Sequence, residues 1–292
     1  LRLTPTPTEE FETTVKRISI AASHKEPVLL IGPSSHKTTA VHSFAQRAGK
    51  PLRQIRLSSD MEVSDLVGRK QPFDLEGAAN HVQLQLLRLL QRLRVLMRTA
   101  GASDASAIPL CEALDEAGVN ASASQLSEWQ TQAQALITKH APEDNGLRLM
   151  MLRVEQGLKL IRAAEEAKDS KPIFLFVDGP LTLSIKLGEV LLLEGYDKPQ
   201  QAVLERFNGL LEADRVFELL EDTAVPAGTN TSIPLLEPFA LCATCGTRSN
   251  ASQSVDSSLS VATRSRFTQV LVPKYSRAAT KAIVTARVNE KA

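Results

Sequence analysis

The stretch from Pro27 to Thr39, PVLLIGPSSHKTT, constrains the fold more than any other part of the chain. Its apolar residues predict a buried strand, its small residues predict a tight turn, and Lys37 and Thr38 are expected to open a helix. This order is typical of a phosphate-binding loop, in which backbone N–H groups, a helix N-terminus and a lysine surround phosphate. The loop departs from the strict pattern, because it is one residue short after Gly32 and His36 replaces the second glycine.

The composition excludes several classes of protein. Charged residues make up 23% of the 292 residues and the formal net charge is +1, which argues against nucleic acid or an acidic membrane as the dominant partner. No apolar run approaches the roughly 20 residues that span a bilayer. Residues 1–8 lack a signal-peptide core and begin without Met, so we expect a piece of a longer chain. With only 3 cysteines the chain suits a reducing compartment, which predicts the cytoplasm or nucleus.

The pattern of apolar residues predicts an α/β fold with a parallel sheet. Expected strands and helices alternate before residue 68 and again after residue 172. Residues 78–170 show only helical periodicity, so we expect a helical insertion there. The expected domains are a leading helix in 1–25, a large α/β domain in 26–277 and a tail in 278–292. The expected strands are 28–31, 54–57, 172–177, 190–193, 239–244 and 269–272, with hairpin arms at 215–220 and 231–236, and the expected helices are 9–22, 37–48, 78–99, 124–140, 147–168, 202–211 and a short one ending at 266.

Two further features fit a phosphate site and also have simpler explanations. Bound Mg²⁺ needs a carboxylate, and Glu194 ends the expected strand 190–193. The next position is Gly195, and Asp197 follows two residues later. Two arginines before Phe267, Arg264 and Arg266, are placed to bring positive charge to a phosphate across an interface. Taken alone, Glu194 is explained as a polar strand end and the arginines as surface residues.

Other candidate features have structural explanations that we favour. Cys242 and Cys245 have the spacing of a metal-ligand pair, but a structural zinc site needs four ligands and the sequence offers no second pair. Trp129 is expected in the core or contact surface of the helical stretch. A solvated face is expected for the arginines of helix 78–99, with docking of protein or RNA as the alternative; these are Arg88, Arg92, Arg94 and Arg98.

Several segments together resemble the dynein-related branch of the AAA+ ATPases. The stretch 188–212, GEVLLLEGYDKPQQAVLERFNGLLE, looks like the second nucleotide motif of that branch. The resemblance covers about 25–79 and 172–275, and midasin-like tandem modules are the members that the chain resembles. It implies a three-layer P-loop NTPase core with a parallel sheet, and a helical lid that is absent or truncated. The other similar segments are 58–68, 176–183, 216–236 and 260–267.

The resemblance also implies a role for each matching position. Thr38 and Glu194 would bind Mg²⁺, and Arg266 would reach the nucleotide of a neighbouring module. Gly195 stands where the branch has its catalytic Glu, and Gly246 stands where it has a polar residue that positions water. The sequence therefore departs from the branch at the positions that would carry out hydrolysis, while it keeps the segments that define the fold. The positions that would bind the phosphates of ATP are Gly32, Ser34, Ser35, His36, Lys37 and Thr38, and the catalytic positions are Glu194, Asp197 and Arg266.

Three functions remain open from the sequence. The first is a degenerate AAA+ module that binds ATP with weak or no hydrolysis, as a structural or regulatory part of a larger ring or tandem ATPase. The second is a competent ATPase that uses Asp197 as the base and remodels a macromolecular assembly. The third is a non-enzymatic protein-interaction module with a vestigial nucleotide site. The expected partners are neighbouring AAA+ modules or subunits and a protein bound through the helical insertion; neither a membrane nor nucleic acid is expected.

Overall fold

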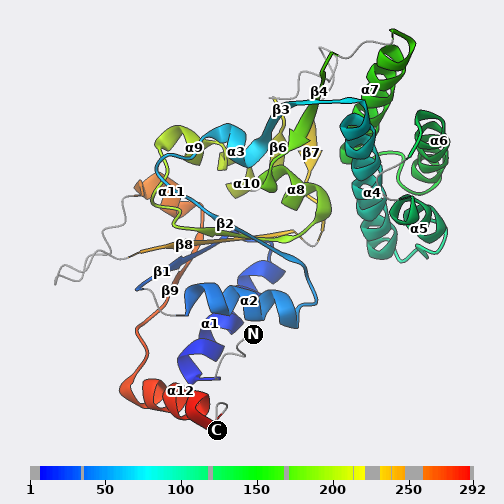
Figure 1. The fold of residues 1–292 in the computed structure, drawn as a ribbon. Helices are drawn as coiled ribbons and strands as arrows, with labels where there is room; N and C mark the ends of the chain where they lie inside the picture. The colour runs from blue at the N-terminus through cyan, green and yellow to red at the C-terminus, as the bar shows by residue number, and fades with distance from the viewer. Residues whose placement is uncertain are drawn as a thin grey trace. The chain divides into compact units, whose positions relative to one another are not determined.

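The chain divides into two compact units, each assembled from separate stretches of sequence (Figure 1). Unit 1 consists of residues 1–62, 189–213 and 240–292, and unit 2 of residues 63–188 and 214–239. Among the residues that the structure describes, no helix is both long enough and apolar enough to cross a membrane. The structure is a computed structural model, and it describes residues 7–33, 36–117, 121–167, 171–212, 214–220, 231–237, 239–246 and 259–289.

Unit 1 is built on a five-stranded parallel sheet in the order β2-β5-β8-β1-β9. Strands β1, β5 and β8 are buried almost throughout, as expected for strands that are covered on both faces. The parallel α/β sheet predicted from the sequence is therefore confirmed. The strands are β1 (Val28–Ile31), β2 (Leu52–Arg56), β5 (Val190–Glu194), β8 (Ala240–Cys245) and β9 (Thr268–Leu271).

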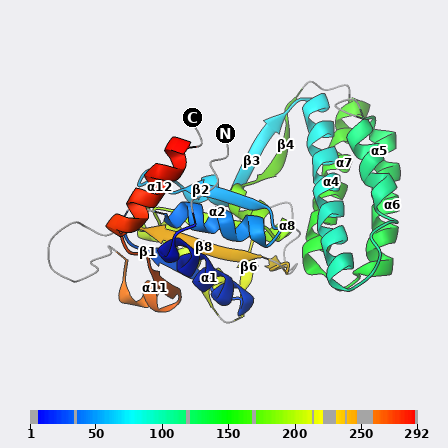
Figure 2. The same cartoon turned by 90° about the horizontal axis from the view of Figure 1, so that it is seen from below.

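Helices cover both faces of this sheet, as Figures 1 and 2 show. On one face, α1 (Glu9–Ser23) and α2 (Lys37–Arg47) lie side by side. Their apolar residues, among them Phe11, Val41 and Phe44, share a core with β1, β5, β8 and β9. The other face carries three short helices, and α12 (Arg277–Asn289) follows β9. The three are α9 (Gln201–Glu205), α10 (Asn208–Leu211) and α11 (Val261–Ser265).

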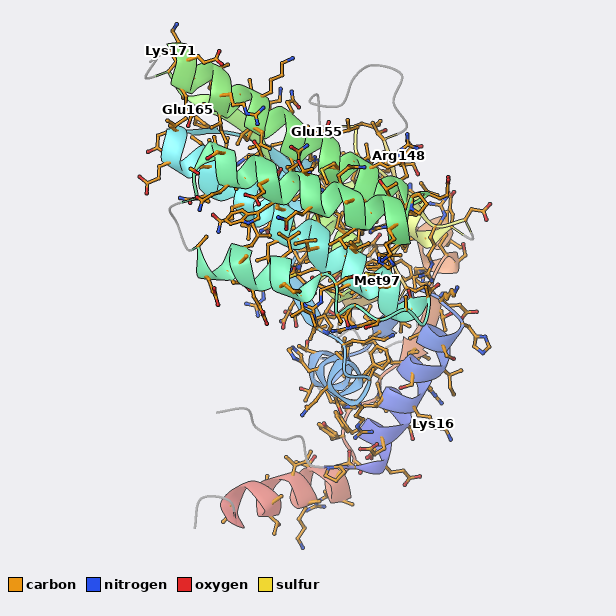
Figure 3. All side chains as sticks on the ribbon, turned by 90° about the vertical axis from the view of Figure 1, so that its right-hand side faces the viewer. Lys16, Met97, Arg148, Glu155, Glu165 and Lys171 are labelled. Atoms are coloured by element: carbon orange, nitrogen blue, oxygen red, sulfur yellow. The ribbon has the colours of Figure 1, made fainter. Side chains whose placement is uncertain are left out.

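Unit 2 contains four helices that share one apolar core. Asp74 caps the first of them by accepting a hydrogen bond from the Gly77 N–H, and Ser122 and Gln125 form a capping box at the third. Trp129 packs against this core and is partly buried. Figure 3 shows charged side chains along the outside of the last helix. The helices are α4 (Leu75–Thr99), α5 (Ile108–Glu116), α6 (Ala123–His140) and α7 (Asn145–Ala167), and the charged residues labelled on α7 in the figure are Arg148, Glu155 and Glu165.

Two small antiparallel sheets complete the described part of unit 2. The first pairs β3 (Gly68–Phe73) with β4 (Ile173–Asp178). The second pairs β6 (Val216–Glu218) with β7 (Ser232–Pro234), which confirms the predicted hairpin arms. Residues 221–230, which connect the two arms, lie outside the described residues. Two short helices, α3 (Val63–Val67) and α8 (Pro180–Leu187), directly precede β3 and follow β4 in the chain.

The structure corrects three local predictions. The strand expected at 172–177 is not part of the parallel sheet, because among the described residues β4 pairs with β3 alone. The helix expected at 202–211 divides into α9 and α10. The solvated face expected on helix 78–99 fails at Arg92, whose side chain is 1% exposed and pairs with Asp144 at 2.8 Å.

Candidate functional site

The candidate site lies at the carboxyl ends of the central strands of unit 1. Gly32 follows β1, while β5 ends at Glu194 and β8 ends at Cys245. In the register of the sheet Ile31 lies opposite Cys245, and Glu194 lies opposite Thr244. Open parallel sheets bind ligands at this edge. The fold thus brings the predicted phosphate loop next to the strand that ends in Glu194.

Lys37 opens α2 and turns its side chain back onto the loop. Its ammonium group donates hydrogen bonds to the carbonyl oxygens of Gly32, Pro33 (3.0 Å) and Cys245 (3.0 Å). Burial lowers the pKa of Lys37, and the nearby Cys245 and Asp197 oppose that shift. The cation therefore sits among backbone carbonyls, which phosphate oxygens can replace because an ammonium group binds charged acceptors more strongly.

Thr38 and Glu194, the two positions predicted on the metal side, contact each other. The Thr38 hydroxyl donates a hydrogen bond to Glu194 Oε1. Glu194 Oε2 accepts a hydrogen bond from Gln54 Nε2 at 2.8 Å and lies 3.5 Å from Arg56 Nε. Burial raises the pKa of Glu194, but the hydrogen bonds from Thr38 and Gln54 and the charge of Arg56 outweigh it and lower that pKa overall. A carboxylate and a hydroxyl thus meet beside the loop.

The lowered pKa of Glu194 predicts a dependence of stability on pH. A carboxylate with a lowered folded pKa contributes stability above its unfolded pKa of about 4.3, and the contribution is lost as pH falls through the folded pKa. We expect Glu194→Gln to cost about 1 kcal/mol of unfolding free energy at about pH 7 and much less at about pH 3. Urea unfolding of both proteins at the two pH values measures this difference. An equal cost at both would contradict the prediction.

The backbone of the loop is suited to an anion. A Cβ at Gly32 would lie 2.2 Å from the Val272 carbonyl oxygen, so only glycine fits there. The first turn of α2 contains no acidic residue, and the N-cap residue His36 makes no side-chain capping hydrogen bond. The His36 side chain therefore leaves the first N–H groups of the helix uncapped, and these groups carry the positive end of its dipole. Ser34 and Ser35, predicted to bind phosphate, lie outside the described residues.

The imidazole of His36 has structural contacts. It is 1% exposed, and its Nε2 lies 3.1 Å from Thr14 Oγ1 in α1. Its ring packs on Tyr275 with the ring centroids 4.6 Å apart. Burial lowers the pKa of His36, the charge of Lys37 lowers it further, and Glu10 opposes both. A phosphate role for His36 rests on its backbone, since its ring serves to join the loop to α1 and to the segment before α12.

The positions expected to carry catalysis form a turn after β5. Gly195 has φ +72°, a left-handed conformation in which any other residue is strained by about 1–2 kcal/mol. Its N–H donates to Thr244 Oγ1 at 3.3 Å, and its carbonyl accepts from the Lys198 N–H at 3.0 Å. The charge of Asp197 raises the pKa of Lys37. Asp197 therefore acts electrostatically on the lysine of the loop. Among the described residues, nothing lies within 4 Å of a Cβ placed at Gly246.

Arg266 contacts residues of its own unit. Its Nη1 donates to Asn208 Oδ1 at 2.5 Å, and its Nη2 lies 3.8 Å from Glu212 Oε1. Its charge lowers the pKa of Tyr196, although burial of that phenol raises the pKa more. The structure thus places Arg266 beside α10, whereas Lys37, Thr38 and Glu194 gather at the loop.

The sequence did not reveal three residues at this edge of the sheet. Gln54 binds Glu194, Thr244 binds the N–H of Gly195, and Tyr196 is fully buried between Phe207 and Phe267. Only the strand order, which puts β2 and β8 on the two sides of β5, identifies the first two. Cys242 and Cys245, for which we favoured a structural explanation, lie buried within β8. Among the described residues, no three His, Cys, Asp or Glu side chains are placed to hold a metal.

Comparison with known proteins agrees with the resemblance noted from the sequence. A family model described as AAA domain (dynein-related subfamily) matches residues 161–267. Midasin from Dictyostelium discoideum is 23% identical over 259 residues, which cover 87% of this chain and 4% of that protein. An ATPase candidate from Cytophaga hutchinsonii, known from a crystal structure, aligns at 13% identity with a TM-score of 0.42 over 96% of this chain and 55% of its own, too distant to bear on function. Over residues 161–267 this chain is similar to AAA domains of the dynein-related subfamily, and over most of its length it is similar to midasin.

Proposed function

We propose that this module binds ATP with Mg²⁺, hydrolyses it weakly or not at all, and is a structural or regulatory part of a larger ring or tandem ATPase. The observation that carries the proposal is the hydrogen bond between Thr38 and Glu194 beside the buried Lys37. These three side chains match the needs of phosphate and metal binding. The next position, Gly195, has no side chain to polarise water.

The residues at the loop fit the nucleotide that AAA+ domains generally bind. The N-terminus of α2 and Lys37 would hold phosphate oxygens. Lys37 would then donate to phosphate in place of the carbonyl oxygens that it now contacts. Thr38 and Glu194 would hold Mg²⁺, which usually takes one or two protein oxygens and completes its shell with phosphate and water. The metal would neutralise phosphate charge when bound. With two protein ligands the site suits a metal that arrives with its nucleotide.

The alternative of a competent ATPase is supported by one feature, the charge of Asp197, which raises the pKa of Lys37. Asp197 is two residues beyond the position of the missing acid, on a turn whose first residue is the left-handed Gly195. The position of the usual catalytic acid is occupied by Gly195, which has no side chain. We therefore place hydrolysis second and assign binding to this module.

Neighbouring AAA+ modules are the partners that the proposal requires. Arg266 is held by one hydrogen bond to Asn208 and one long ion pair with Glu212. It would break these contacts to bind the nucleotide of a neighbouring module. Helices α4 to α7 would be an insertion in the AAA+ domain and would carry a protein partner. The chain spans 4% of the length of the midasin it matches, so the activity of any larger assembly is part of this proposal.

Calorimetric titration with ATP–Mg²⁺ tests the binding. We expect Lys37→Ala to weaken binding about tenfold to a hundredfold, since it removes a charge-assisted contact to phosphate. Lys16→Ala is the matched control, because Lys16 is an exposed lysine on α1. It should bind like the parent chain. No binding by the parent chain would leave the interaction module as the function.

A phosphate-release assay on the same proteins tests hydrolysis. We expect release below about 0.01 s⁻¹, roughly a hundredfold under the low end of ordinary turnover. Sustained release that Asp197→Ala abolishes would instead establish the variant ATPase and reject weak hydrolysis. Binding and turnover are measured separately, so one can fail while the other holds.

A further inference from the structure

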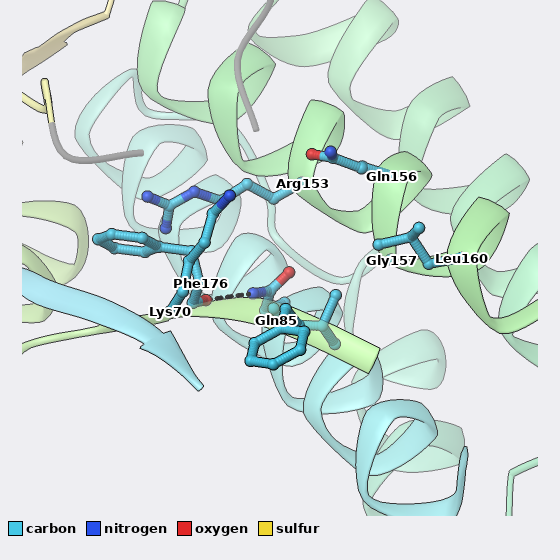
Figure 4. A pocket seen from close by; sticks show the side chains of 9 residues that line it. Lys70, Gln85, Arg153, Gln156, Gly157, Leu160 and Phe176 are labelled. Carbon is cyan, nitrogen blue, oxygen red and sulfur yellow. Dashed lines mark hydrogen bonds between the residues drawn. The ribbon is translucent and has the colours of Figure 1, made fainter. Parts of the chain in front are cut away.

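A small pocket in unit 2 lies between the β3–β4 ribbon and α7 (Figure 4). Its cavity volume is about 30 Å³, which is room for about two water molecules. A space of this size admits the tip of one side chain and excludes a nucleotide. The lining residues that matter below are Lys70, Arg153, Gln156, Leu160, Phe174 and Phe176.

The inner wall of the pocket is fixed by buried contacts. The Arg153 guanidinium lies 4.6 Å from the centroid of the Phe176 ring and donates a hydrogen bond to Asp178. Gln85 Nε2 donates to the Phe176 carbonyl oxygen at 3.4 Å, as the dashed line in Figure 4 shows. Arg153 and Gln85 are both buried. A ligand would therefore meet a wall that is already organised, which reduces the entropy lost on binding.

The mouth of the pocket is positively charged. Lys70 is exposed on β3 and lies opposite Phe176, so the two side chains share one face of the ribbon. Among the described residues, the side chain of Lys70 makes no ion pair and no hydrogen bond. The described lining contains Lys70 and Arg153 but no carboxylate. The charge of the mouth therefore complements an acidic group.

Next to this charge lie apolar surface and an unsatisfied acceptor. Phe174 is 57% exposed and Leu160 is 36% exposed, and both line the pocket. Gln156 Oε1 is buried without a hydrogen-bond partner among the described residues. A buried acceptor that lacks a donor is unfavourable, and an incoming N–H would satisfy it. The pocket thus offers contacts to a carboxylate, an apolar side chain and an N–H donor.

The strand beside the pocket is a poor template for a further strand. Pro72, opposite Phe174 in the ribbon, has no N–H to donate to a ladder. Prolines and lysines on exposed strands are common devices against strand addition. A partner would therefore bind through its side chains and one backbone N–H, not as a third strand.

We propose that this pocket docks a segment of a partner protein in which an acidic residue stands next to a large apolar residue. The carboxylate binds Lys70, the apolar side chain packs on Phe174 and Leu160, and a backbone N–H of the segment donates to Gln156 Oε1. The pocket is independent of the nucleotide loop, so this docking holds whether or not the module binds ATP.

Selection of random octapeptides displayed on phage against the 292-residue chain tests the proposal. We expect enrichment of Asp or Glu directly beside Phe, Leu, Ile or Met. A selected peptide, labelled with fluorescein, is then titrated against variants by fluorescence polarisation. We expect Lys70→Glu and Phe174→Ser each to weaken binding about tenfold, and Lys70→Ala about threefold. The affinity should also fall as salt is raised.

The matched control is Lys159→Glu, which makes the same charge change at an exposed position of α7 outside the pocket and should leave the affinity unchanged. Circular dichroism melts check that each variant is folded. If Phe174→Ser unfolds, Lys70→Glu still tests the proposal, because it changes a surface residue. The proposal is overturned if no peptide is enriched, or if the peptides bind Lys70→Glu as well as the parent chain. Self-association or binding of a labelled single-stranded RNA that Lys70→Glu abolishes would also overturn it, in favour of a second copy or nucleic acid.

Discussion

Replacing Asp178 with alanine is expected to lower the free energy of unfolding by about 3–5 kcal/mol, because it leaves two buried cations without their shared carboxylate. Lys186 Nζ donates to both carboxylate oxygens, at 3.0 and 2.8 Å, and Arg153 donates to one of them. The three side chains are at most 5% exposed. Burial raises the pKa of Asp178, but the two cations outweigh it and hold that pKa far below its usual range.

Urea unfolding at neutral pH measures this effect, and Asp65→Ala serves as the control. Asp65 is exposed and lies 4.0 Å from Arg69, so its loss should cost less than about 0.5 kcal/mol. The contribution of Asp178 is present above the unfolded pKa of an aspartate, about 3.9, and is lost only as pH falls through the lower folded pKa. Equal costs for the two variants at neutral pH would show that the buried cluster adds no stability.

Replacing Arg92 with methionine is expected to cost about 2–4 kcal/mol, although the volume of its stem is kept. The guanidinium binds both carboxylate oxygens of Asp144, at 2.9 and 2.8 Å. It also donates to the carbonyl oxygens of Lys186 and Pro234, each at 3.2 Å. Methionine removes these four hydrogen bonds, and Asp144, which is only 12% exposed, keeps among the described residues only the one that its Oδ1 accepts from the Leu147 N–H at 2.7 Å.

Arg98→Met is the matched control on the same helix. Arg98 is 61% exposed and pairs with Asp104, which also pairs with Arg94. Its loss should cost less than about 1 kcal/mol. Thermal and urea unfolding compare the two variants. If Arg92→Met and Arg98→Met were equally stable, the buried pair would be replaceable by apolar packing.

Local patterns predicted most elements of the fold but not their tertiary partners. The leucine spacing of α4 identified a helix, yet Arg92 borders the apolar side of that helix and its partner Asp144 is far along the chain. The segment 172–177 had the apolar character of a sheet strand. Its actual partner, β3, has the sequence GRKQPF. Glycine, proline and lysine are depleted in strands, so this sequence does not predict one.

In the candidate site, too, some residues could be predicted from local sequence and others could not. The loop was evident because strand, turn and helix follow one another directly in the sequence, and Glu194 because an acid ends an apolar strand. Gln54 and Thr244 carry no local signal, since they reach Glu194 and Gly195 only through the order of the strands. His36 was predicted near phosphate, but its burial against Tyr275 depends on how the end of the chain returns to the loop.

The position of β1 in the sheet affects how the chain can fold while it is being synthesised. β1 lies between β8 and β9, both of which come from the last part of the chain. A ribosome that adds about 5–20 residues per second needs on the order of tens of seconds to reach them. During that time the apolar sequence VLLI has neither of its neighbouring strands. We therefore expect the nascent chain to need chaperones, or early packing of α1 and α2 over β1, to avoid aggregation until β8 and β9 have been made.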